Sequence, residues 1–304
     1  MYNRVIEITK QIQETNPEIK VSCDEKLSAH TSFRIGGRVA VMFFPETASQ
    51  LARIAGAFEE NGIQPYILGN GTNILASDKD LPIPVIKTLQ MCSLELTGPG
   101  EITAQCGATL SRTAMFAMEK GLAGLSFAHG IPGTVGGAVV MNAGAYGGEI
   151  RDVLVSTRVY SKGKIYTVTG ADNDLSYRHS RFTDSGEIVL EAVFRLEPGD
   201  PEQIREEIRD LAERRRKSQP LDQRSAGSTF KRPATGYAAA MIEQAGLKGL
   251  TVGGAQVSEK HAGFVINRGG ATCEDVRELM RQVQQAVREK FGTELEPEVK
   301  LWSL

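Results

Sequence analysis

Apolar and polar positions recur along this chain with two periods, which predict helices in some stretches and strands in others. After Thr47, a favourable helix N-cap, apolar residues recur on one helical face until Gly62. The apolar run 65–68 then fits a short buried strand and leads into the glycine-containing loop 69–73. This succession predicts a small α/β unit near the N-terminus.

The middle of the chain has the pattern of a β-rich region. Residues 102–105, 154–160 and 188–196 have the residue types of strands, and residues 110–120 show one helical pattern. The stretch 121–148 is rich in glycine and fits neither period. We therefore predict a second region made mainly of short strands.

The last third predicts helices followed by a terminal strand. Asp200 and Pro201 fit the N-cap and first position of a helix that ends in the basic run 214–217. Another helix begins after the cap residue Thr272, and residues 294–302 alternate as a strand would. Together the three regions predict an α+β fold.

Glycine gathers in the string between Gly121 and Gly148, and apolar residues fill most of the gaps. A solvated surface loop would carry mainly Ser, Asp, Asn and Lys there. Because glycine has no Cβ, its N–H can approach an anion closely and its φ can turn positive. The composition favours a loop that cradles a pyrophosphate over a turn-rich surface loop.

The loop Leu68-Gly-Asn-Gly-Thr-Asn73 is a second phosphate-binding candidate, because two glycines alternate with side chains that donate hydrogen bonds. It is not the G-x-G-x-x-G fingerprint, since Ile74 stands where a small residue is needed. No G-x-x-x-x-G-K-[ST] occurs in the chain either. The two loops predict a nucleotide held by backbone amides in a fold of neither the Rossmann nor the P-loop type.

Composition excludes several classes of protein. The 304 residues are 41% apolar, which suffices for two or three domains with their own cores. A net charge of −2 provides no general field for a nucleic acid, so we expect no nucleic-acid partner. Because no long apolar stretch or signal-peptide pattern occurs, we expect a cytoplasmic protein that does not insert into a membrane.

Cysteine and histidine give no metal-binding pattern. Four cysteines without a C-x-x-C pair are expected to be reduced thiols, and four histidines without H-E-x-x-H predict no metal site. The fragment Gly124-Leu-Ser-Phe-Ala128 departs from G-x-S-x-G at its last position. We therefore expect Ser126 to be a core serine.

Four strings that follow one another along the chain resemble a single family. They are Thr31-Ser-Phe-Arg-Ile-Gly-Gly37, Leu68-Gly-Asn-Gly-Thr-Asn73, Gly130-Ile-Pro-Gly-Thr-Val-Gly-Gly-Ala138 with Met141-Asn-Ala-Gly-Ala-Tyr-Gly-Gly148, and Ser225-Ala-Gly-Ser-Thr-Phe-Lys231. In order and content they are similar to the UDP-N-acetylenolpyruvoylglucosamine reductases over residues 31–300.

The resemblance implies an FAD-dependent oxidoreductase of peptidoglycan precursor synthesis. It would reduce UDP-N-acetylglucosamine enolpyruvate to UDP-N-acetylmuramate through non-covalent FAD. NADPH would be the hydride donor, although the sequence does not distinguish NADPH from NADH.

The resemblance also implies a two-subdomain FAD-binding fold of the vanillyl-alcohol-oxidase type with a C-terminal α+β substrate domain. The expected parts are an N-terminal helix and FAD-binding subdomain over 1–88, a second FAD-binding subdomain over 89–199 and a substrate-binding domain over 200–304. We expect a monomer.

FAD would be held by the two glycine-containing loops and by the residues that follow the second one. The positions implied are Gly69, Asn70, Gly71, Thr72, Asn73, Gly130, Ile131, Pro132, Gly133, Thr134, Gly136, Gly137, Ala138, Asn142, Ala143 and Gly144.

Three residues match the family's catalytic positions. Arg178 fits the pattern Tyr-Arg-x-Ser-x-Phe, which selects it over Arg181, and Ser228 follows Ala-Gly. Glu298 fits the family's spacing from the C-terminus better than Glu296 does. Without the resemblance these residues would be read as a surface ion-pair residue, a turn hydroxyl and a solvent-facing glutamate on an edge strand.

Substrate contacts are less specific in the sequence. Lys217, Lys231 and His261 are candidates for contacting the UDP phosphates or the nicotinamide nucleotide. Arg232 and Gly263 stand where Asn is frequent in relatives, which puts contacts there in doubt. The span between Phe182 and Ser228 is too short for the tyrosine-bearing lid of one subgroup, so we place the chain in the subgroup without that lid.

Two other functions stay open from the sequence. One is a flavin or nucleotide-binding module without catalysis, which would not oxidise NADPH. The other is an oxidase of the same flavin fold, in which oxygen accepts the electrons and His30 or His129 tethers FAD covalently.

Overall fold

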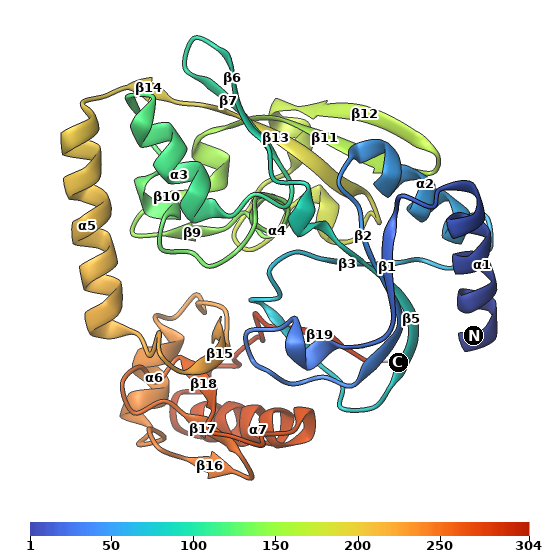
Figure 1. The fold of residues 1–304 in the computed structure, drawn as a ribbon. Coiled ribbons are helices and arrows are strands. Elements are labelled where there is room, and N and C mark those ends of the chain that lie inside the picture. Colours follow the sequence, from blue (N-terminus) through green and yellow to red (C-terminus); the bar gives the residue numbers. More distant parts are fainter. Residues whose placement is uncertain (304) are drawn as a thin grey trace. The chain divides into compact units, whose positions relative to one another are not determined.

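The computed structural model describes residues 1–303 and divides them into two compact units (Figure 1). Unit 1 comprises Met1–Asp24, Ala40–Asn70 and Pro82–Arg214. Unit 2 comprises Glu25–Val39, Gly71–Leu81 and the described residues 215–303. The predicted division at residues 88/89 and 199/200 is a different one, and it stays a prediction.

Unit 1 contains a five-stranded antiparallel sheet in the order β12-β11-β13-β7-β6. Its strands are β6 (Leu94–Gly98), β7 (Glu101–Gln105), β11 (Leu154–Ser161), β12 (Lys164–Thr169) and β13 (Ile188–Arg195). The three strands predicted in this region are therefore confirmed as β7, β11 and β13. The predicted helix is α3 (Leu110–Glu119), capped by the Thr109 hydroxyl, which accepts a hydrogen bond from the Arg112 amide.

The N-terminal helix α1 (Tyr2–Thr15) packs against α2 (Ala48–Glu59) in unit 1. Val5, Ile8 and Ile12 form the buried face of α1. The predicted cap of α2 is confirmed, because the Thr47 side chain accepts a hydrogen bond from the Gln50 amide.

A four-stranded sheet in the order β1-β2-β5-β3 carries the chain from one unit to the other. Its strands are β1 (Lys20–Lys26), β2 (Arg38–Phe44), β3 (Tyr66–Leu68) and β5 (Leu81–Lys87). β3 is the predicted buried strand and pairs in parallel with β5. It ends at Leu68, so the glycine loop begins at the end of a sheet strand, where ligands commonly bind in α/β arrangements.

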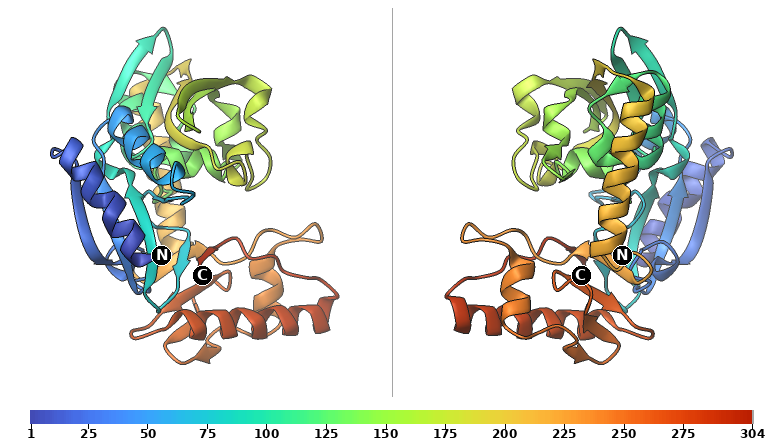
Figure 2. Two further views of the ribbon diagram at one scale, coloured as in Figure 1. Left: turned by 90° about the vertical axis from the view of Figure 1, so that its right-hand side faces the viewer. Right: turned by 90° about the vertical axis from the view of Figure 1, so that its left-hand side faces the viewer.

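Unit 2 contains a four-stranded sheet in the order β15-β18-β17-β16, and α7 packs against β16 and β17 (Figure 2). Its elements are β15 (Arg224–Ser228), α6 (Ala238–Gln244), β16 (Thr251–Val252), β17 (Ala255–Val257), β18 (Phe264–Asn267) and α7 (Cys273–Phe291). The predicted cap at Thr272 forms a reciprocal capping box with Asp275. Val276, Leu279, Val283 and Val287 form the buried stripe of α7.

The last strand, β19 (Lys300–Trp302), pairs in parallel with β4 (Ile74–Ala76) in unit 2. The predicted terminal strand is thus shorter than its alternating pattern. Pro297 lacks an N–H, and around it only an isolated bridge to Phe230 forms.

The remaining elements lie between these strands and helices along the chain. The long helix α5 (Pro201–Ser218) begins at the predicted cap, where the Asp200 carboxylate accepts from the Glu202 amide. The other elements are η1 (Leu27–Ala29), η2 (Thr88–Gln90), β8 (Leu122–Ala123), η3 (Ser126–Ala128), α4 (Val135–Val140), β9 (Gly144–Ala145), β10 (Gly148–Glu149), η4 (Ile150–Asp152), η5 (Gly170–Asn173), η6 (Arg181–Thr183) and β14 (Glu197–Pro198). The helix α4, inside the glycine-rich segment, was not predicted.

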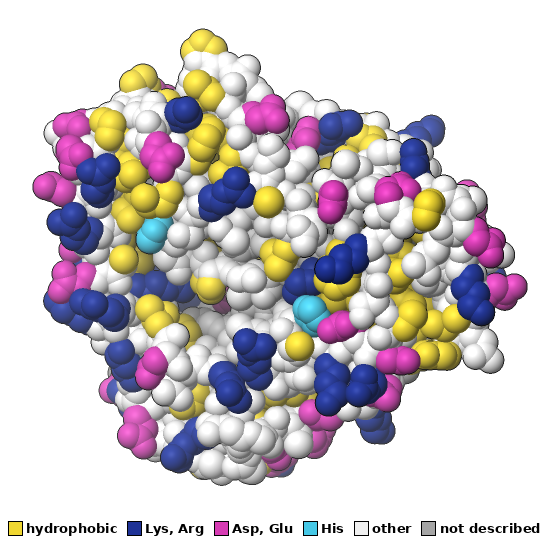
Figure 3. Space-filling view, in the orientation of Figure 1, with side chains coloured by type: hydrophobic (Ala, Val, Ile, Leu, Met, Phe, Trp, Pro, Cys, Tyr) yellow, Lys and Arg dark blue, Asp and Glu magenta, His cyan; other side chains and the backbone are white. Residues whose placement is uncertain are grey.

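Charged side chains of both signs are interspersed on the face drawn in Figure 3. This mixture fits the small net charge of −2. Among residues 1–303, no helix combines the length and the apolar character needed to cross a bilayer.

Candidate active site

In unit 1, the start of the first glycine loop lies directly against the second glycine loop. The Asn70 side-chain amide donates to the Pro132 carbonyl at 2.6 Å. A Cβ on residue 69 would lie 2.3 Å from Thr134 Oγ1, closer than real Cβ contacts come. The structure therefore brings Gly69, Asn70, Pro132 and Thr134 together, and glycine at position 69 is required by contact with protein.

The second loop runs along the segment 106–110 of unit 1 before α4 begins. The Gly133 carbonyl accepts from the Leu110 amide at 3.1 Å, and the Gly136 amide donates to the Cys106 carbonyl at 2.8 Å. A Cβ on residue 136 would lie 2.9 Å from Cys106 Cβ, so this glycine also permits a close approach of protein to protein. Gly136 and Ala138 are buried, whereas Gly130, Ile131, Pro132, Gly133 and Gly137 are partly or fully exposed.

In unit 2, the rest of the first loop is fixed at Gly71. This residue has φ 66°, and a Cβ on it would lie 2.1 Å from the His30 carbonyl oxygen. The Gly71 carbonyl accepts from the Ser32 amide at 3.0 Å, and the Ser32 hydroxyl donates to the Ser225 carbonyl at 2.6 Å. Ser32 therefore ties the loop to β15, a role that the sequence did not reveal.

Within residues 1–303, the backbone amides of Gly71, Thr72 and Asn73 donate to no protein acceptor. Consecutive amides that follow a left-handed residue form the type of concave nest that binds anions. The Asn73 side chain is used differently, because its amide donates to the Glu298 carbonyl at 3.2 Å. The loop thus offers backbone donors while one of its side chains holds the C-terminal segment.

Arg178 lies at the tip of a tight turn in unit 1. Ser176 and His179 exchange backbone hydrogen bonds of 3.1 and 3.2 Å, which leaves Tyr177 and Arg178 as the two turn residues. Arg178 has φ 55°, a left-handed conformation that a residue with a Cβ adopts at a cost. Its guanidinium donates to the Gly144 carbonyl at 3.3 Å. Arg178 is thus a half-buried cation whose backbone and side chain are both constrained.

The neighbouring arginine, Arg181, forms a bidentate ion pair with a buried glutamate. Its Nε and Nη2 donate to both carboxylate oxygens of Glu187 at 3.0 and 2.9 Å, and the Glu187 side chain is 4% exposed. Burial alone would raise the pKa of Glu187, but hydrogen bonds from Tyr166 and Arg181 hold it below its ordinary value. Of the two arginines, Arg181 is therefore the structural one.

Ser228 in unit 2 is presented by a β-bulge. Ser225 pairs with Ile266 and Ser228 with Phe264, so two residues of β15 oppose one residue of β18. Gly227, with φ 77°, takes the left-handed position that such a bulge requires. Ser228 is exposed, and its hydroxyl has no hydrogen-bond partner within residues 1–303.

Glu298 lies between two parts of unit 2. Its amide donates to the Thr229 carbonyl at 2.8 Å, and its own carbonyl accepts from Asn73. Glu298 is half-buried, whereas Glu296 is exposed and forms an ion pair with Lys231. The backbone therefore places Glu298 beside the residue that follows Ser228.

Two of the substrate-contact candidates have defined surroundings in unit 2. Lys231 is paired with Glu296, while Lys217 lies on the exposed last turn of α5. The His261 ring contacts Phe264 edge-on at 5.0 Å, and Phe264 is also the strand partner of Ser228. Burial lowers the pKa of His261, and its Nδ1 accepts a hydrogen bond from the Gly263 amide.

Cysteines and histidines form no metal-binding cluster among residues 1–303. All four cysteines are free, and burial raises the pKa of Cys106 to about 12. Ser126 is 4% exposed, which confirms the predicted core serine.

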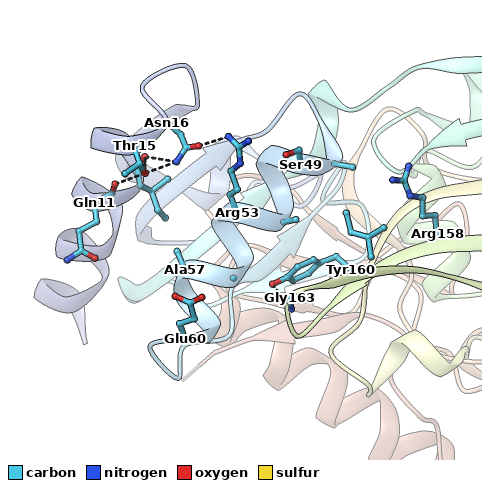
Figure 4. Close-up of a pocket in the computed structure, with 15 residues that line it drawn as sticks. Gln11, Thr15, Asn16, Ser49, Arg53, Ala57, Glu60, Arg158, Tyr160 and Gly163 are labelled. Carbon is cyan, nitrogen blue, oxygen red and sulfur yellow. Dashed lines mark hydrogen bonds between the residues drawn. The ribbon is translucent and has the colours of Figure 1, made fainter.

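A groove of about 660 Å³ lies elsewhere in unit 1, between α1, α2 and the β11–β12 hairpin. Figure 4 shows Arg53, Tyr160 and Arg158 among its lining residues. Arg53 donates to Asn16 at 2.7 Å, and Tyr160 donates to Glu59 at 2.9 Å. None of the predicted site residues lines this groove.

Comparisons with known proteins match two separate stretches of the chain to family models. Residues 39–169 match the family model "FAD binding domain", and residues 219–302 match the C-terminal domain of UDP-N-acetylenolpyruvoylglucosamine reductase. The UDP-N-acetylenolpyruvoylglucosamine reductase of Caldanaerobacter subterraneus subsp. tengcongensis is 43% identical over 97% of each chain. The chain belongs to the UDP-N-acetylenolpyruvoylglucosamine reductase family.

Solved structures show the same relationship. The UDP-N-acetylenolpyruvylglucosamine reductase of Thermus caldophilus matches with a TM-score of 0.80 and 31% identity, covering 94% of this chain and 99% of that one. An alkyldihydroxyacetonephosphate synthase matches with a TM-score of 0.50 and 15% identity over 63% of this chain and 40% of that one, which shows the fold alone. The reductase chain is therefore an oxidoreductase with an FAD-binding domain, and the predicted α+β FAD-binding fold is confirmed.

The donor set fits FAD. The free amides of Gly71–Asn73 suit a pyrophosphate, which needs several hydrogen-bond donors. Asn142 fits less directly, because it is fully buried and its side-chain amide already bonds Glu149 and the Ser176 carbonyl.

Proposed function

We propose that this reductase uses NADPH and non-covalent FAD to convert UDP-N-acetylglucosamine enolpyruvate to UDP-N-acetylmuramate, in peptidoglycan precursor synthesis. One observation carries the choice of catalytic residues. At both ambiguous positions the competing neighbour forms an ion pair with another residue, Arg181 with the buried Glu187 and Glu296 with Lys231. We therefore favour Arg178 and Glu298, which match the family's catalytic positions, for the chemistry.

Bound FAD would supply hydride chemistry, taking a hydride from NADPH and delivering it from N5 to C3 of the enolpyruvyl group. We assign the binding of this cofactor to Gly69–Asn73 and to the predicted FAD residues of 130–144 other than Asn142, whose side chain is bonded to protein. Non-covalent binding fits the surroundings of one of the two candidate tethers, because His30 Nε2 lies 2.9 Å from Glu25 Oε1.

Side chains of the protein would stabilise the charge that develops on the substrate and supply the proton that C2 receives. Hydride addition at C3 leaves negative charge spread over C2 and the carboxylate, and Arg178 with protonated Glu298 would stabilise it by charge and hydrogen bonding. Ser228 would then donate its proton to C2, which completes the saturated product. The exposed hydroxyl of Ser228 suits this task because no protein acceptor competes for its proton within residues 1–303.

Lys217, Lys231 and His261 stay proposed contacts to substrate or nucleotide, and the absence of a tyrosine lid stays a prediction. The same holds for the cytoplasmic location, the monomeric state and the lack of a nucleic-acid partner. We further propose that NADPH and the UDP-sugar react in turn at overlapping positions. Ping-pong initial-rate kinetics with substrate inhibition would support this, and intersecting lines would contradict it.

An anaerobic experiment tests the assignment step by step. The FAD-loaded parent and Ser228→Ala are first reduced with NADPH and then mixed with UDP-N-acetylglucosamine enolpyruvate in a stopped-flow instrument. We expect equal reduction of both proteins but a loss of at least about 10²-fold in reoxidation of the variant, or about 2.7 kcal/mol of barrier. Ser228→Cys should retain more activity than Ser228→Ala. Parental reoxidation of Ser228→Ala would remove the serine from the mechanism.

A further inference from the structure

Asn142 lies two residues after the end of α4 and is fully buried, with φ 41°. Its side-chain nitrogen donates to Glu149 Oε2 at 2.7 Å and to the Ser176 carbonyl at 3.0 Å. Its side-chain oxygen accepts from the Arg151 amide at 2.9 Å. Three of the four hydrogen bonds that a side-chain amide can form are therefore directed to protein.

The Ser176 carbonyl is the entry to the turn that carries Arg178, and the stretch Val140–Gly144 holds this turn at two more points. The Val140 carbonyl accepts from the hydroxyls of Ser180 at 2.8 Å and Thr183 at 3.2 Å, just after the turn. The Gly144 carbonyl accepts from Arg178 itself. All of these contacts lie within unit 1, and they fix the entry, the side chain and the exit of the turn.

A residue with a Cβ stays at a positive φ only where its surroundings impose that conformation. Arg178 is such a residue, and the hydrogen bond from Asn142 fixes the first residue of its turn. We propose that Asn142 is a positioning residue, which holds Arg178 in place through the Ser176 backbone. This inference rests on the proposed catalytic role of Arg178.

The alternative role for Asn142 is direct binding of FAD, and the two roles predict different defects. A cofactor ligand would affect FAD content and reduction by NADPH. A positioning residue for Arg178 affects only the step in which charge develops on the substrate, since a small displacement of a catalytic group can cost up to about 10²-fold.

The test compares Asn142→Ala with the matched control Asn173→Ala. Asn173 is also buried in unit 1, at 1% exposed, and its amide donates to the Gly170 carbonyl at 3.0 Å. For Asn142→Ala we expect parental FAD content, a parental rate of reduction by NADPH and reoxidation by UDP-N-acetylglucosamine enolpyruvate slowed about 10- to 100-fold. The loss should appear in the limiting rate more than in the substrate concentration at half-saturation. Asn173→Ala should match the parent in both half-reactions.

A double-variant cycle identifies the route of the effect. If Asn142 acts through Arg178, adding Asn142→Ala to Arg178→Ala should slow reoxidation by less than about twofold further. Ser180→Ala removes one hydrogen bond to the same stretch and serves if Asn142→Ala does not fold; it should cause a smaller loss that also vanishes in the Arg178→Ala background.

Loss of FAD, an equal fall in both half-reactions, or full additivity with Arg178→Ala would overturn the inference while leaving the proposed function intact. A parental reoxidation rate in Asn142→Ala would overturn it as well. If Arg178→Ala itself reoxidises at the parental rate, the proposed role of Arg178 fails first, and the inference fails with it.

Discussion

Gly69 and Thr134 lie so close together that a Cβ on residue 69 would be 2.3 Å from the threonine hydroxyl oxygen. The contact joins the loop after β3 to the glycine-rich loop before α4. Both loops were predicted to hold the same pyrophosphate, and glycine at position 69 is a condition for their contact.

Gly69→Ala should therefore separate the two loops and weaken FAD binding. The Thr134 side chain is buried, so the new methyl group must displace either the threonine hydroxyl within the packed interior or one of the two loops. We expect a lower ratio of flavin absorbance to protein absorbance after purification and an increased dissociation constant in FAD titrations. Gly98→Ala is a matched control, because its Cβ would meet no atom closer than 3.4 Å. Parental FAD affinity in Gly69→Ala would show that the contact is not needed for the cofactor.

Arg181→Gln should destabilise the protein without an effect on chemistry. Removing Arg181 leaves the Glu187 carboxylate, which is 4% exposed, without its ion-pair partner. Arg181 is itself partly exposed, so the cost is smaller than for a fully buried pair, about 2 kcal/mol of unfolding free energy. Reoxidation of the reduced flavin should stay parental, in contrast to Arg178→Ala. Denaturant unfolding and stopped-flow measurements on both variants check this pair of expectations.

The stabilisation from Glu187 should depend on pH in a defined direction. Because the pKa of Glu187 is held below its ordinary value of 4.5, the folded state favours the carboxylate. The stabilisation is then fully present above pH 4.5 and is lost as the pH falls through the folded-state pKa. The difference in Tm between the parent and Arg181→Gln should be largest near neutral pH and should shrink in acid. A constant difference would mean that Arg181 acts through packing alone.

Gly227→Ala should slow reoxidation by moving Ser228. Gly227 has φ 77° and a Cβ there would meet nothing within 4 Å, so the substitution strains only the bulge, by about 1 kcal/mol. We expect reoxidation to fall about tenfold, with parental reduction by NADPH. Gly246→Ala has the same φ of 77° and an equally open site, and it should lose similar stability but no activity. Equal activity in the two variants would mean that the bulge does not aim Ser228.

Much of this fold could be predicted, because caps and periodicity act locally. Thr47, Thr272 and Asp200 begin helices where the sequence predicted them, since each satisfies amides within its own first turn. The helix α4 was missed because its glycines suit a helix only when the segment packs against Cys106 and Ala108. Such contacts between distant parts of the chain leave no periodic signal.

The candidate site shows the same limit. The glycine loops were found from composition, yet composition could not reveal that Gly69, Gly71 and Gly136 are required by contacts with protein. The preference for Arg178 over Arg181 came from the family pattern alone. The structural role of Arg181, its pairing with the buried Glu187, becomes visible only when the start of β13 is placed beside η6.

The two glutamates near the C-terminus give the sharpest matched pair, because they differ by two positions and by their partners. Glu296 is 69% exposed and paired with Lys231, so Glu296→Gln should change stability by less than about 1 kcal/mol and leave reoxidation parental. Glu298→Gln keeps the size of the side chain and its backbone bonds to Thr229 and Asn73, but it removes the acid that would stabilise charge on the substrate carboxylate. We expect FAD binding and reduction by NADPH to persist, with reoxidation slowed at least about 10²-fold. Stopped-flow traces of both variants decide the assignment. If Glu296→Gln shows the loss and Glu298→Gln does not, the catalytic acid is Glu296 and its pairing with Lys231 belongs to the mechanism.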